Sequence, residues 1–320
     1  MQKQRIGFII NPISGTNKKK HIPDLIEENL SKELFLKPDI LFTEHKGHAI
    51  EIARKLAQQK YDIVVAVGGD GTVNEVAQGL LHTETVLGII PVGSGNGLAR
   101  HLGIPMNSTH AIEVINMLQT ATIDYGKANE QFFFCTCGTG FDANVSWDFA
   151  KSHKRGLNSY IELALKNYIN FTPQHYILTN DKIQIEQSAF LITFANAAQY
   201  GNNIYIAPQA SILDGMMDIA IFSEFPVTAL PEITLKLLTR QIDKSIYLNY
   251  LQTDKITLNC PEKSLQFHID GEAVMMETPI DICIIPAGLK VICKNKRKSN
   301  NEQNIFVKGL ESMKKSLKSI

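Results

Sequence analysis

The first third of the chain alternates between short apolar runs and longer stretches in which apolar residues recur with a helical spacing. The apolar runs are rich in β-branched residues and predict strands at Ile6–Ile10, Ile40–Thr43, Ile63–Val67, Val86–Val92 and around Ile123. The helical spacing predicts helices at Ile22–Leu36, Gly47–Gln58, Thr72–Leu81 and Ser108–Leu118. Short strands that are apolar on both faces and alternate with helices indicate a parallel sheet covered on both sides.

The pattern changes after Lys127, where strand-like segments follow one another with turn residues between them. These segments are QFFFCTCG, HYILTN, KIQIEQ, AFLITFANA, GMMDIAIFS, SIYLNYL, DKITLNC, LQFHIDG and IDICIIP. Helical stretches are expected only at Leu157–Phe171 and Pro226–Thr239. The pattern predicts an antiparallel sandwich or barrel. We therefore expect an α/β domain at 1–127, a β domain at 128–297 and a basic tail at 298–320, which could pack back on the first domain.

Composition adds that the chain can bury large cores and has no global charge. Of its 320 residues 44% are hydrophobic, and 32 Lys+Arg balance 32 Asp+Glu. A chain of this length is expected to form about two domains. Without a basic field, no nucleic acid is expected as a partner. Positions 294–320 hold eight Lys/Arg against two Glu, which indicates either a solvated helix face or attraction to an anionic membrane.

The cysteines and the longest apolar runs restrict the surroundings of the protein. The five cysteines have no CxxC spacing, so neither a disulfide framework nor a zinc site is expected, and a reduced cytoplasmic environment is the simplest interpretation. No apolar stretch approaches the roughly 20 residues that a membrane-spanning helix needs. Any contact with a membrane is therefore expected to be peripheral.

Three loops rich in glycine, serine and asparagine follow predicted strands of the first domain. They are Asn11–Gly15, the segment AVGGDGTVNEV at 66–76 and the segment GSGNG at 93–97. Because parallel strands end at the same sheet edge, the loops are expected to meet there and to offer backbone N–H groups to a polyphosphate. Lys18–Lys20 could add charge or form ordinary surface. The sequence matches neither the Rossmann nor the Walker A pattern.

Together these motifs resemble the diacylglycerol kinase catalytic family, which also includes sphingosine and ceramide kinases. The resemblance rests on NPISG, GGDGT with Asn74 and Glu75 behind it, GSGNGLAR, LDGMMDIAIF and HIDGE, in this order from Asn11 to about Cys293. GGDGT alone also occurs in NAD kinases and resembles a phosphofructokinase signature, so the ordered set carries the argument. The resemblance implies a phosphofructokinase-like parallel α/β domain, a C-terminal antiparallel β-sandwich domain that takes the lipid, and ATP and Mg²⁺ as cofactors.

The resemblance also implies roles for individual residues. Nucleotide contacts are expected from Asn11, Pro12, Ile13, Ser14, Gly15, Thr43, Gly68, Gly69, Asp70, Gly71, Thr72, Val73, Asn74, Glu75, Ser94, Gly95 and Asn96. The family's structural Mg²⁺ site corresponds to Asp214 with backbone oxygens of Ser211 and Met216, a stretch that by itself would pass as a hairpin turn. Asp124 is a candidate for the Mg²⁺-linked carboxylate network, and Asp142 for the lipid-facing cleft.

The implied reaction is transfer of the γ-phosphoryl group of ATP to the hydroxyl of diacylglycerol, a sphingoid base or a related lipid. Two carboxylates compete as proton acceptor. Glu272 matches the residue usually named in bacterial members and is preferred, with Asp70 organising the reactive Mg²⁺. Asp70 is often assigned the acceptor role in the sphingosine kinase branch. Gly97 stands where many bacterial diacylglycerol kinases have aspartate, so the identity of the acceptor stays open.

Two other functions remain as alternatives. The first is a soluble-metabolite kinase of the NAD kinase type, against which the ordered NPISG, GSGNGLA and DGMMD set argues. The second is a non-catalytic nucleotide or lipid sensor, against which the presence of both Asp70 and Glu272 argues. The preferred hypothesis is a cytoplasmic kinase that meets its lipid peripherally at a membrane surface. The choice of lipid and the formation of a homodimer are left open.

Overall fold

The computed structural model describes residues 2–12, 21–152, 157–168 and 170–294. Several predictions concern residues outside these ranges, namely the nucleotide contacts Ile13, Ser14 and Gly15, the charge at Lys18–Lys20 and the basic tail from 298. None of the helices in the described ranges combines the length and apolarity needed to cross a membrane.

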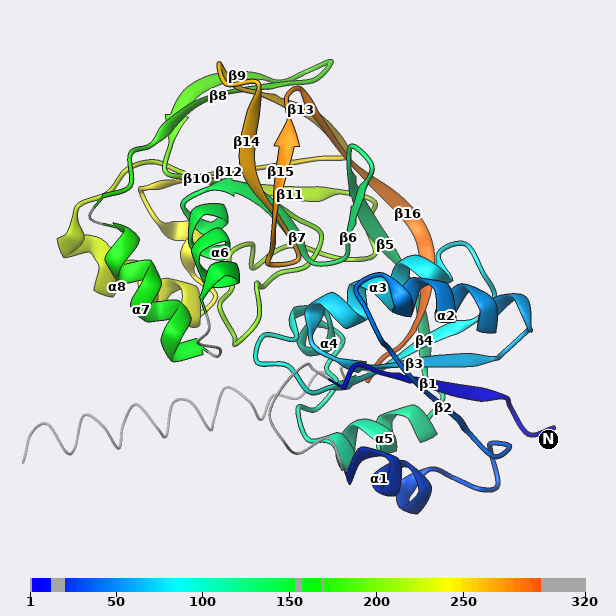
Figure 1. The fold of residues 1–320 in the computed structure, drawn as a ribbon. Helices are drawn as coiled ribbons and strands as arrows, with labels where there is room; N and C mark the ends of the chain where they lie inside the picture. Colours follow the sequence, from blue (N-terminus) through cyan, green and yellow to red (C-terminus); the bar gives the residue numbers. More distant parts are fainter. Residues whose placement is uncertain (1, 13–20, 153–156, 169, 295–320) are drawn as a thin grey trace, which may run out of the picture.

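Four parallel strands form the sheet of the first domain, in the order β2-β1-β3-β4 (Figure 1). Their bounds are Ile6–Ile10 for β1, Asp39–Phe42 for β2, Ile63–Gly68 for β3 and Val86–Pro91 for β4. Helices α2 (His48–Gln58) and α3 (Asp70–Leu80) pack together on one face, and α1 (Ile22–Asn29) and α5 (Ser108–Asn116) on the other. The short helix α4 is Gly97–His101. The predicted parallel sheet with helices on both faces is confirmed.

The second domain is a sandwich of two mostly antiparallel sheets. One sheet has six strands in the order β12-β11-β10-β7-β14-β15, and the other continues from the first domain through β16, β13, β8 and β9, with β5 and β6 beside β16. The bounds are β5 Thr120–Ala128, β6 Gln131–Phe133, β7 Thr136–Gly140, β8 Gln174–Thr179, β9 Gln184–Ala189, β10 Leu191–Ala195, β11 Met217–Phe222, β12 Leu248–Thr253, β13 Lys255–Asn259, β14 Ser264–Ile269, β15 Glu272–Glu277 and β16 Ile280–Ile292. Phe194 and Phe267 of one sheet share a buried core with Tyr176 and Leu258 of the other.

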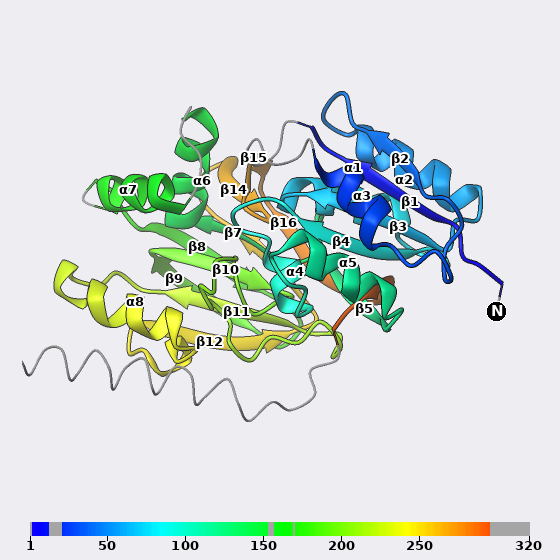
Figure 2. The same ribbon diagram turned by 90° about the horizontal axis from the view of Figure 1, so that it is seen from below.

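Helices also cover the outer face of the six-stranded sheet. They are α6 (Phe141–Lys151), α7 (Leu157–Tyr168) and α8 (Leu230–Leu238), with short 3₁₀ turns at Val227–Ala229 and Ile242–Lys244. Figure 2 shows α7 and α8 at the end of the second domain that lies away from the first domain. Phe190 and Ile233 belong to a second core beneath these helices. The α/β plus β-sandwich fold expected from the sequence is therefore the observed one.

Strand β16 joins the two domains into a single sheet. Its first part pairs antiparallel with β13 and β5, and Val291 near its end pairs in parallel with Leu87 of β4. The resulting sheet has ten strands and runs through both domains. Because β16 holds the second domain against the carboxyl-end loops of the first, it determines which residues face each other across the candidate site.

The structure corrects some boundaries. The helix predicted at Ile22–Leu36 ends at Asn29, because Asn116 of α5 donates to the Asn29 carbonyl oxygen (2.9 Å) and accepts from the Ser31 N–H (3.1 Å). Phe35 then forms a bridge to Gln4 instead of continuing the helix. Helices α4 and α6 and strand β15 were not predicted, since none has a strong apolar period.

Candidate active site

A pocket of about 330 Å³ opens between the carboxyl ends of the first-domain strands and the start of β15. It is lined by Asn11, Thr43, Glu44, His45, Lys46, Ala49, Gly69, Gly71, Thr72, Glu75 and Glu272. All but the last come from the first domain, and most of the predicted contacts among them belong to the glycine-rich loops. The structure therefore brings Glu272 into the same pocket as the loops that were predicted to hold a nucleotide.

The first two loops contact each other at the base of this pocket. The Asn11 side-chain amide donates to Thr72 Oγ1 (3.2 Å), and the Asn11 N–H donates to the Val67 carbonyl oxygen (3.2 Å). A Cβ added to Gly68 would lie 2.5 Å from Thr72 Cβ, so only glycine leaves space for the threonine. Thr72 is thereby held in the first turn of α3, where backbone N–H groups are free of helical partners.

Asp70 connects the second loop to the third. Its carboxylate accepts the backbone N–H groups of Asn96 (2.8 Å) and Gly97 (2.7 Å), and it does not line the pocket. Burial raises the pKa of Asp70 to about 6, although both N–H donors act in the opposite direction. The carboxylate is therefore occupied in fixing a neighbouring loop.

The third loop packs closely against the second one. Asn96 is buried in the left-handed conformation with φ 51°, and its amide donates to the Gly93 carbonyl oxygen at 2.6 Å. A Cβ on Gly93 would lie 2.6 Å from Gly69 Cα, which shows how closely the two loops approach. Ser94 is exposed, and neither it, Gly95 nor Asn96 lines the pocket, so their role as nucleotide contacts stays a prediction.

Gly97 departs from the aspartate common in this loop, and its packing explains the small residue. An added Cβ would lie 3.2 Å from Cys135 Sγ and 3.2 Å from the Tyr200 carbonyl oxygen. Any larger side chain would have to displace one of these neighbours. The Gly97 N–H already pairs with Asp70, so the loop is held without a carboxylate of its own.

The remaining predicted contacts of α3 have different surroundings. Glu75 lines the pocket, and its carboxylate accepts the N–H groups of Gly47 (2.9 Å) and Ala49 (3.3 Å) at the start of α2. A carboxylate at a helix N-terminus is favourable, and here it fixes the loop that carries Lys46. Val73 is buried in the core of the first domain, and Pro12 is exposed beside the pocket-lining Asn11.

Glu272 faces the first domain from the other side of the pocket. It follows Asp270 and Gly271, whose φ values of 48° and 84° form the tight turn between β14 and β15. Its Oε2 accepts from Lys46 Nζ at 2.9 Å, and this hydrogen bond is the main cause that raises the pKa of Lys46. A Cβ added to Gly71 would lie 2.1 Å from Glu272 Oε1. The carboxylate thus stands directly over the glycine loop.

Sequence reasoning missed Asp270, which precedes Glu272 by two residues. Its carboxylate accepts from the Asn74 amide (2.8 Å) and from the N–H groups of Phe134 (3.0 Å), Cys135 (2.8 Å) and Thr136 (3.1 Å). Burial raises its pKa, while these donors act to lower it. The motif HIDGE contains Asp270, but Asp-Gly is typical of a turn. The turn alone explains the aspartate, so the sequence offers no reason to expect further contacts of its carboxylate.

The stretch predicted as a structural metal site lies apart from the pocket. Asp214 is exposed and accepts from the Met216 N–H (3.1 Å) and the Gln252 amide (3.3 Å), while Ser211 Oγ accepts from the Leu213 N–H (3.3 Å). Among the described residues, no three or more His, Cys, Asp or Glu side chains gather as a metal site. One exposed carboxylate with backbone oxygens does suit a Mg²⁺ that keeps several waters.

Asp124 lies beside this loop and is buried. It accepts the N–H groups of Gly215 (2.8 Å) and Ala287 (2.8 Å), so it fixes the loop against the irregular part of β16. Asp124 therefore contacts the loop that carries Asp214, and its role in a Mg²⁺-linked network stays a prediction.

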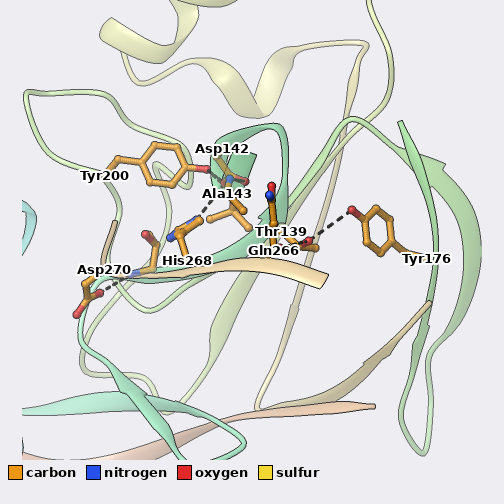
Figure 3. A network of polar contacts seen from close by, with 10 residues as sticks. Thr139, Asp142, Ala143, Tyr176, Tyr200, Gln266, His268 and Asp270 are labelled. Carbon is orange, nitrogen blue, oxygen red and sulfur yellow. Dashed lines mark hydrogen bonds and ion pairs between the residues drawn. The ribbon is translucent and has the colours of Figure 1, made fainter. Parts of the chain in front are cut away.

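Asp142 is buried at the start of α6 and takes part in a polar network (Figure 3). It accepts from Tyr200 OH (2.7 Å), lies 3.0 Å from His268 Nε2 and accepts from Thr193 Oγ1 (3.2 Å). His268 belongs to β14, the strand that leads to Glu272. The structure places Asp142 as an anchor of this strand, and its expected contact with a lipid stays a prediction.

Comparisons with known proteins identify the family to which this fold belongs. Residues 5–128 match the diacylglycerol kinase catalytic domain, and residues 135–293 match the YegS C-terminal NAD kinase beta sandwich-like domain. The chain is 30% identical to a diacylglycerol kinase of Bacillus subtilis, over 84% of this chain and 90% of that one. It is 29% identical to a probable lipid kinase YegS-like of Chromohalobacter salexigens, over 72% and 76% of the two chains. The protein therefore belongs to the diacylglycerol kinase family.

Solved structures show the same fold. A putative diacylglycerol kinase from Bacillus anthracis superposes with a TM-score of 0.75 at 24% identity, covering 92% of this chain and 99% of that one. Yeast NADH kinase, solved in complex with NADH, gives a TM-score of 0.51 at 10% identity, covering 93% and 86%. The two-domain architecture is thus shared with both of these proteins.

Proposed function

We propose that this protein is an ATP- and Mg²⁺-dependent lipid kinase that transfers the γ-phosphoryl group to the hydroxyl of diacylglycerol, a sphingoid base or a related lipid. One observation carries the proposal. Glu272 of the second domain stands over Gly71 in a pocket whose other walls come largely from the glycine-rich loops of the first domain. Phosphoryl transfer needs positioning, neutralisation of charge and one proton acceptor, and this pocket offers residues for each requirement. The names of the relatives support a lipid as acceptor.

The nucleotide side of the pocket is suited to phosphate. Gly69 and Gly71 have no side chains to keep a phosphate away from the backbone, and they lie at the N-terminus of α3, where the helix dipole favours negative charge. Lys46 is the one lysine or arginine among the described pocket-lining residues. In the proposed complex its ammonium group contacts the transferring phosphate, and Mg²⁺ bound with the nucleotide neutralises further charge.

The acceptor side provides the proton acceptor. As the lipid hydroxyl oxygen bonds to the γ-phosphorus, its proton passes to Glu272, the bond between the γ-phosphorus and the β–γ bridging oxygen breaks, and ADP leaves. The exposed position of the Glu272 carboxylate supports this assignment. Asp70 is the weaker candidate, because its carboxylate accepts two backbone N–H groups and does not line the pocket. In this proposal Asp70 shapes the loops that surround the Mg²⁺-bound phosphates.

A second part of the proposal is that the Asp214 loop binds a structural Mg²⁺ through the Asp214 carboxylate and the carbonyl oxygens of Ser211 and Met216. The exposed carboxylate and the adjacent turn support it. A ligand that binds only the folded protein raises the melting temperature. We expect Mg²⁺ to raise the melting temperature of the wild type and to leave that of Asp214→Ala unchanged. Equal shifts in the two proteins would exclude Asp214 as a ligand.

The main experiment measures transfer of label from γ-labelled ATP with Mg²⁺ into the organic phase of mixed micelles. Diacylglycerol, sphingoid base, ceramide and phosphatidylglycerol are offered in parallel, with NAD⁺ in a separate aqueous reaction. Glu272→Gln serves as the blank, because this carboxylate is exposed and its replacement disturbs little packing.

The outcomes separate the candidate functions. A lipid whose labelling falls ~10²–10⁴-fold in the Glu272→Gln reaction supports the lipid kinase and identifies its acceptor. Label in NADP⁺ with none in lipid would replace the proposal with the soluble-metabolite kinase, whose fold this protein shares. Binding of ATP without any labelled product in this panel would favour a sensor.

A further inference from the structure

One face of helix α3 contacts the turn that carries Glu272. Gly71, Asn74 and Gln78 recur at i, i+3 and i+7, so they lie along one side of the helix. Glu272 lies against Gly71, and Asp270 pairs with Asn74. Three helical residues rise by about 4.5 Å, so two side chains separated by a single residue in a tight turn can reach both positions. The turn of the second domain is thereby held in register on the helix of the first.

Asn74 is fixed in the orientation that this contact requires. Its Oδ1 accepts from the Gln78 amide (2.6 Å), so its Nδ2 faces the second domain and donates to Asp270 Oδ2 (2.8 Å) and to the Phe132 carbonyl oxygen (3.0 Å). The contact therefore joins the nucleotide loop to both the β14–β15 turn and strand β6.

Asp270 is in turn fixed by three consecutive N–H groups between β6 and β7, those of Phe134, Cys135 and Thr136. Two residues earlier, on β14, His268 is held by Asp142, and Figure 3 shows His268 on the strand and Asp270 just beyond its end. The carboxylate of Glu272, by contrast, is 48% exposed and has Lys46 as its partner. The position of the Glu272 backbone is therefore fixed mainly by the contacts of Asp270, two residues before it.

We propose that Asp270 is a positioning residue for phosphoryl transfer, which acts through Asn74 and the turn to hold Glu272 over Gly71. This inference rests on the proposed function. It assigns to Asp270 no contact with substrate. Reacting groups need close alignment, and a misplacement of about 1 Å can cost on the order of 10²-fold in rate. Loss of the Asp270 contacts should therefore lower kcat and leave the binding of ATP nearly unchanged.

The test compares Asp270→Asn in two backgrounds, the wild type and Glu272→Gln, with the labelled-ATP assay. In the wild type we expect kcat to fall roughly 10²-fold with little change in the KM for ATP. In Glu272→Gln the same substitution should have almost no further effect, because a positioning residue acts only through the group that it positions. A merely structural role would lower kcat by the same factor in both backgrounds.

Asp218→Asn is the matched control. Asp218 is a buried carboxylate on β11 that accepts from Tyr250 OH (2.6 Å), away from the residues that line the pocket. It should lower the melting temperature without the selective loss of kcat. If Asp270→Asn fails to fold in a thermal scan, Asn74→Ala removes one of the four contacts of Asp270 and should show the same dependence on Glu272.

Each result decides between the two proposals. Equal losses of kcat in both backgrounds, or a loss confined to the KM for ATP, would overturn the role of Asp270 and leave the lipid kinase intact. A wild type that labels no lipid would overturn the proposed function, and the inference with it. A loss of kcat that disappears in Glu272→Gln supports both.

Discussion

The two walls of the pocket are built by different means. The first-domain wall consists of loops whose glycines permit close backbone approach, as at Gly93 and Gly69. The second-domain wall is a single turn that carries Glu272 and is held by side-chain contacts of Asp270. The first wall is suited to bind a group through backbone N–H donors, whereas the second presents one carboxylate.

This difference affects how each wall tolerates change. A loop built from glycine positions fails when a side chain is added, because the space is already filled by another part of the backbone. A turn held by a carboxylate fails when the carboxylate is removed, because several N–H donors then lack an acceptor. Substitutions that add atoms to the first wall and remove charge from the second therefore probe the comparison directly.

The largest effect is expected for Glu272→Gln. Loss of a general base costs ~10²–10⁴ in rate. The fold and the affinity for ATP should be retained, because the side chain is 48% exposed. The measurement is kcat in the labelled-ATP assay together with a thermal scan. A reduction of only a few-fold would mean that another group accepts the proton, and Asp70 would be the next to test.

Gly71→Ala should lower activity while leaving the helix sound. The added Cβ would lie 2.1 Å from Glu272 Oε1, so the carboxylate must move, and we expect a loss of kcat on the order of 10-fold to 10²-fold. Alanine is also a better helix former than glycine, by up to about 1 kcal/mol, so the melting temperature should not fall. Gly69→Ala is the comparison variant, because its Cβ meets only Gly93 Cα at 3.5 Å and stays clear of Glu272, so it reports crowding of the phosphate alone. Similar losses in both variants would mean that crowding of Glu272 is not the cause.

The difference between the walls also explains what the sequence could predict. The glycine-rich loops are contiguous motifs next to strands. The pocket contains five residues that the sequence predicts as nucleotide contacts: Asn11, Thr43, Gly69, Gly71 and Thr72. Strand ends of a parallel sheet meet for topological reasons, so local pattern was sufficient there. Strands whose bounds follow the local apolar pattern, such as β1 and β3, were predicted almost to the residue.

Contacts between distant segments were beyond local pattern. The sequence separates Asn74 from Asp270 by 196 positions, and nothing in either segment indicates that they pair. Lys46 was missed for the same reason, since its partner is 226 positions away. The early end of α1 depends on Asn116. In each case the contact or the helix end depends on a side chain from another element. The spacing of apolar residues, by contrast, predicts only the element in which it occurs.

The titration of Asp70 tests whether the first wall has a buried charge of its own. Burial raises the pKa of Asp70 from 3.8 to about 6, so the folded protein binds this proton more tightly than the unfolded chain. The resulting stabilisation is present at pH below the unfolded pKa and is lost as the pH rises through about 6. Asn does not titrate. The free energy of unfolding of the wild type minus that of Asp70→Asn should therefore increase by ~1 kcal/mol between about pH 7 and about pH 5. A constant or decreasing difference would show that Asp70 is not buried as an anion.

The smallest effect on stability is expected where the two walls touch. The ion pair of Lys46 and Glu272 is 83% and 48% exposed, and such surface pairs contribute about 0–1 kcal/mol. Lys46→Met should therefore unfold at nearly the wild-type temperature but raise the KM for ATP several-fold, most strongly at low salt, where charge is least screened.

The matched control is Lys255→Met, which removes a comparably exposed pair with Asp181 at 2.8 Å, on residues that do not line the pocket. It should change stability as little as Lys46→Met and leave the KM for ATP unaltered. If the wild type, Lys46→Met and Lys255→Met have the same KM for ATP, Lys46 does not contact the nucleotide and only pairs with Glu272. A selective, salt-dependent rise in Lys46→Met would instead mean that the lysine exchanges a carboxylate for a phosphate when the nucleotide binds, so that the contact between the walls in the free protein is the one that ATP replaces.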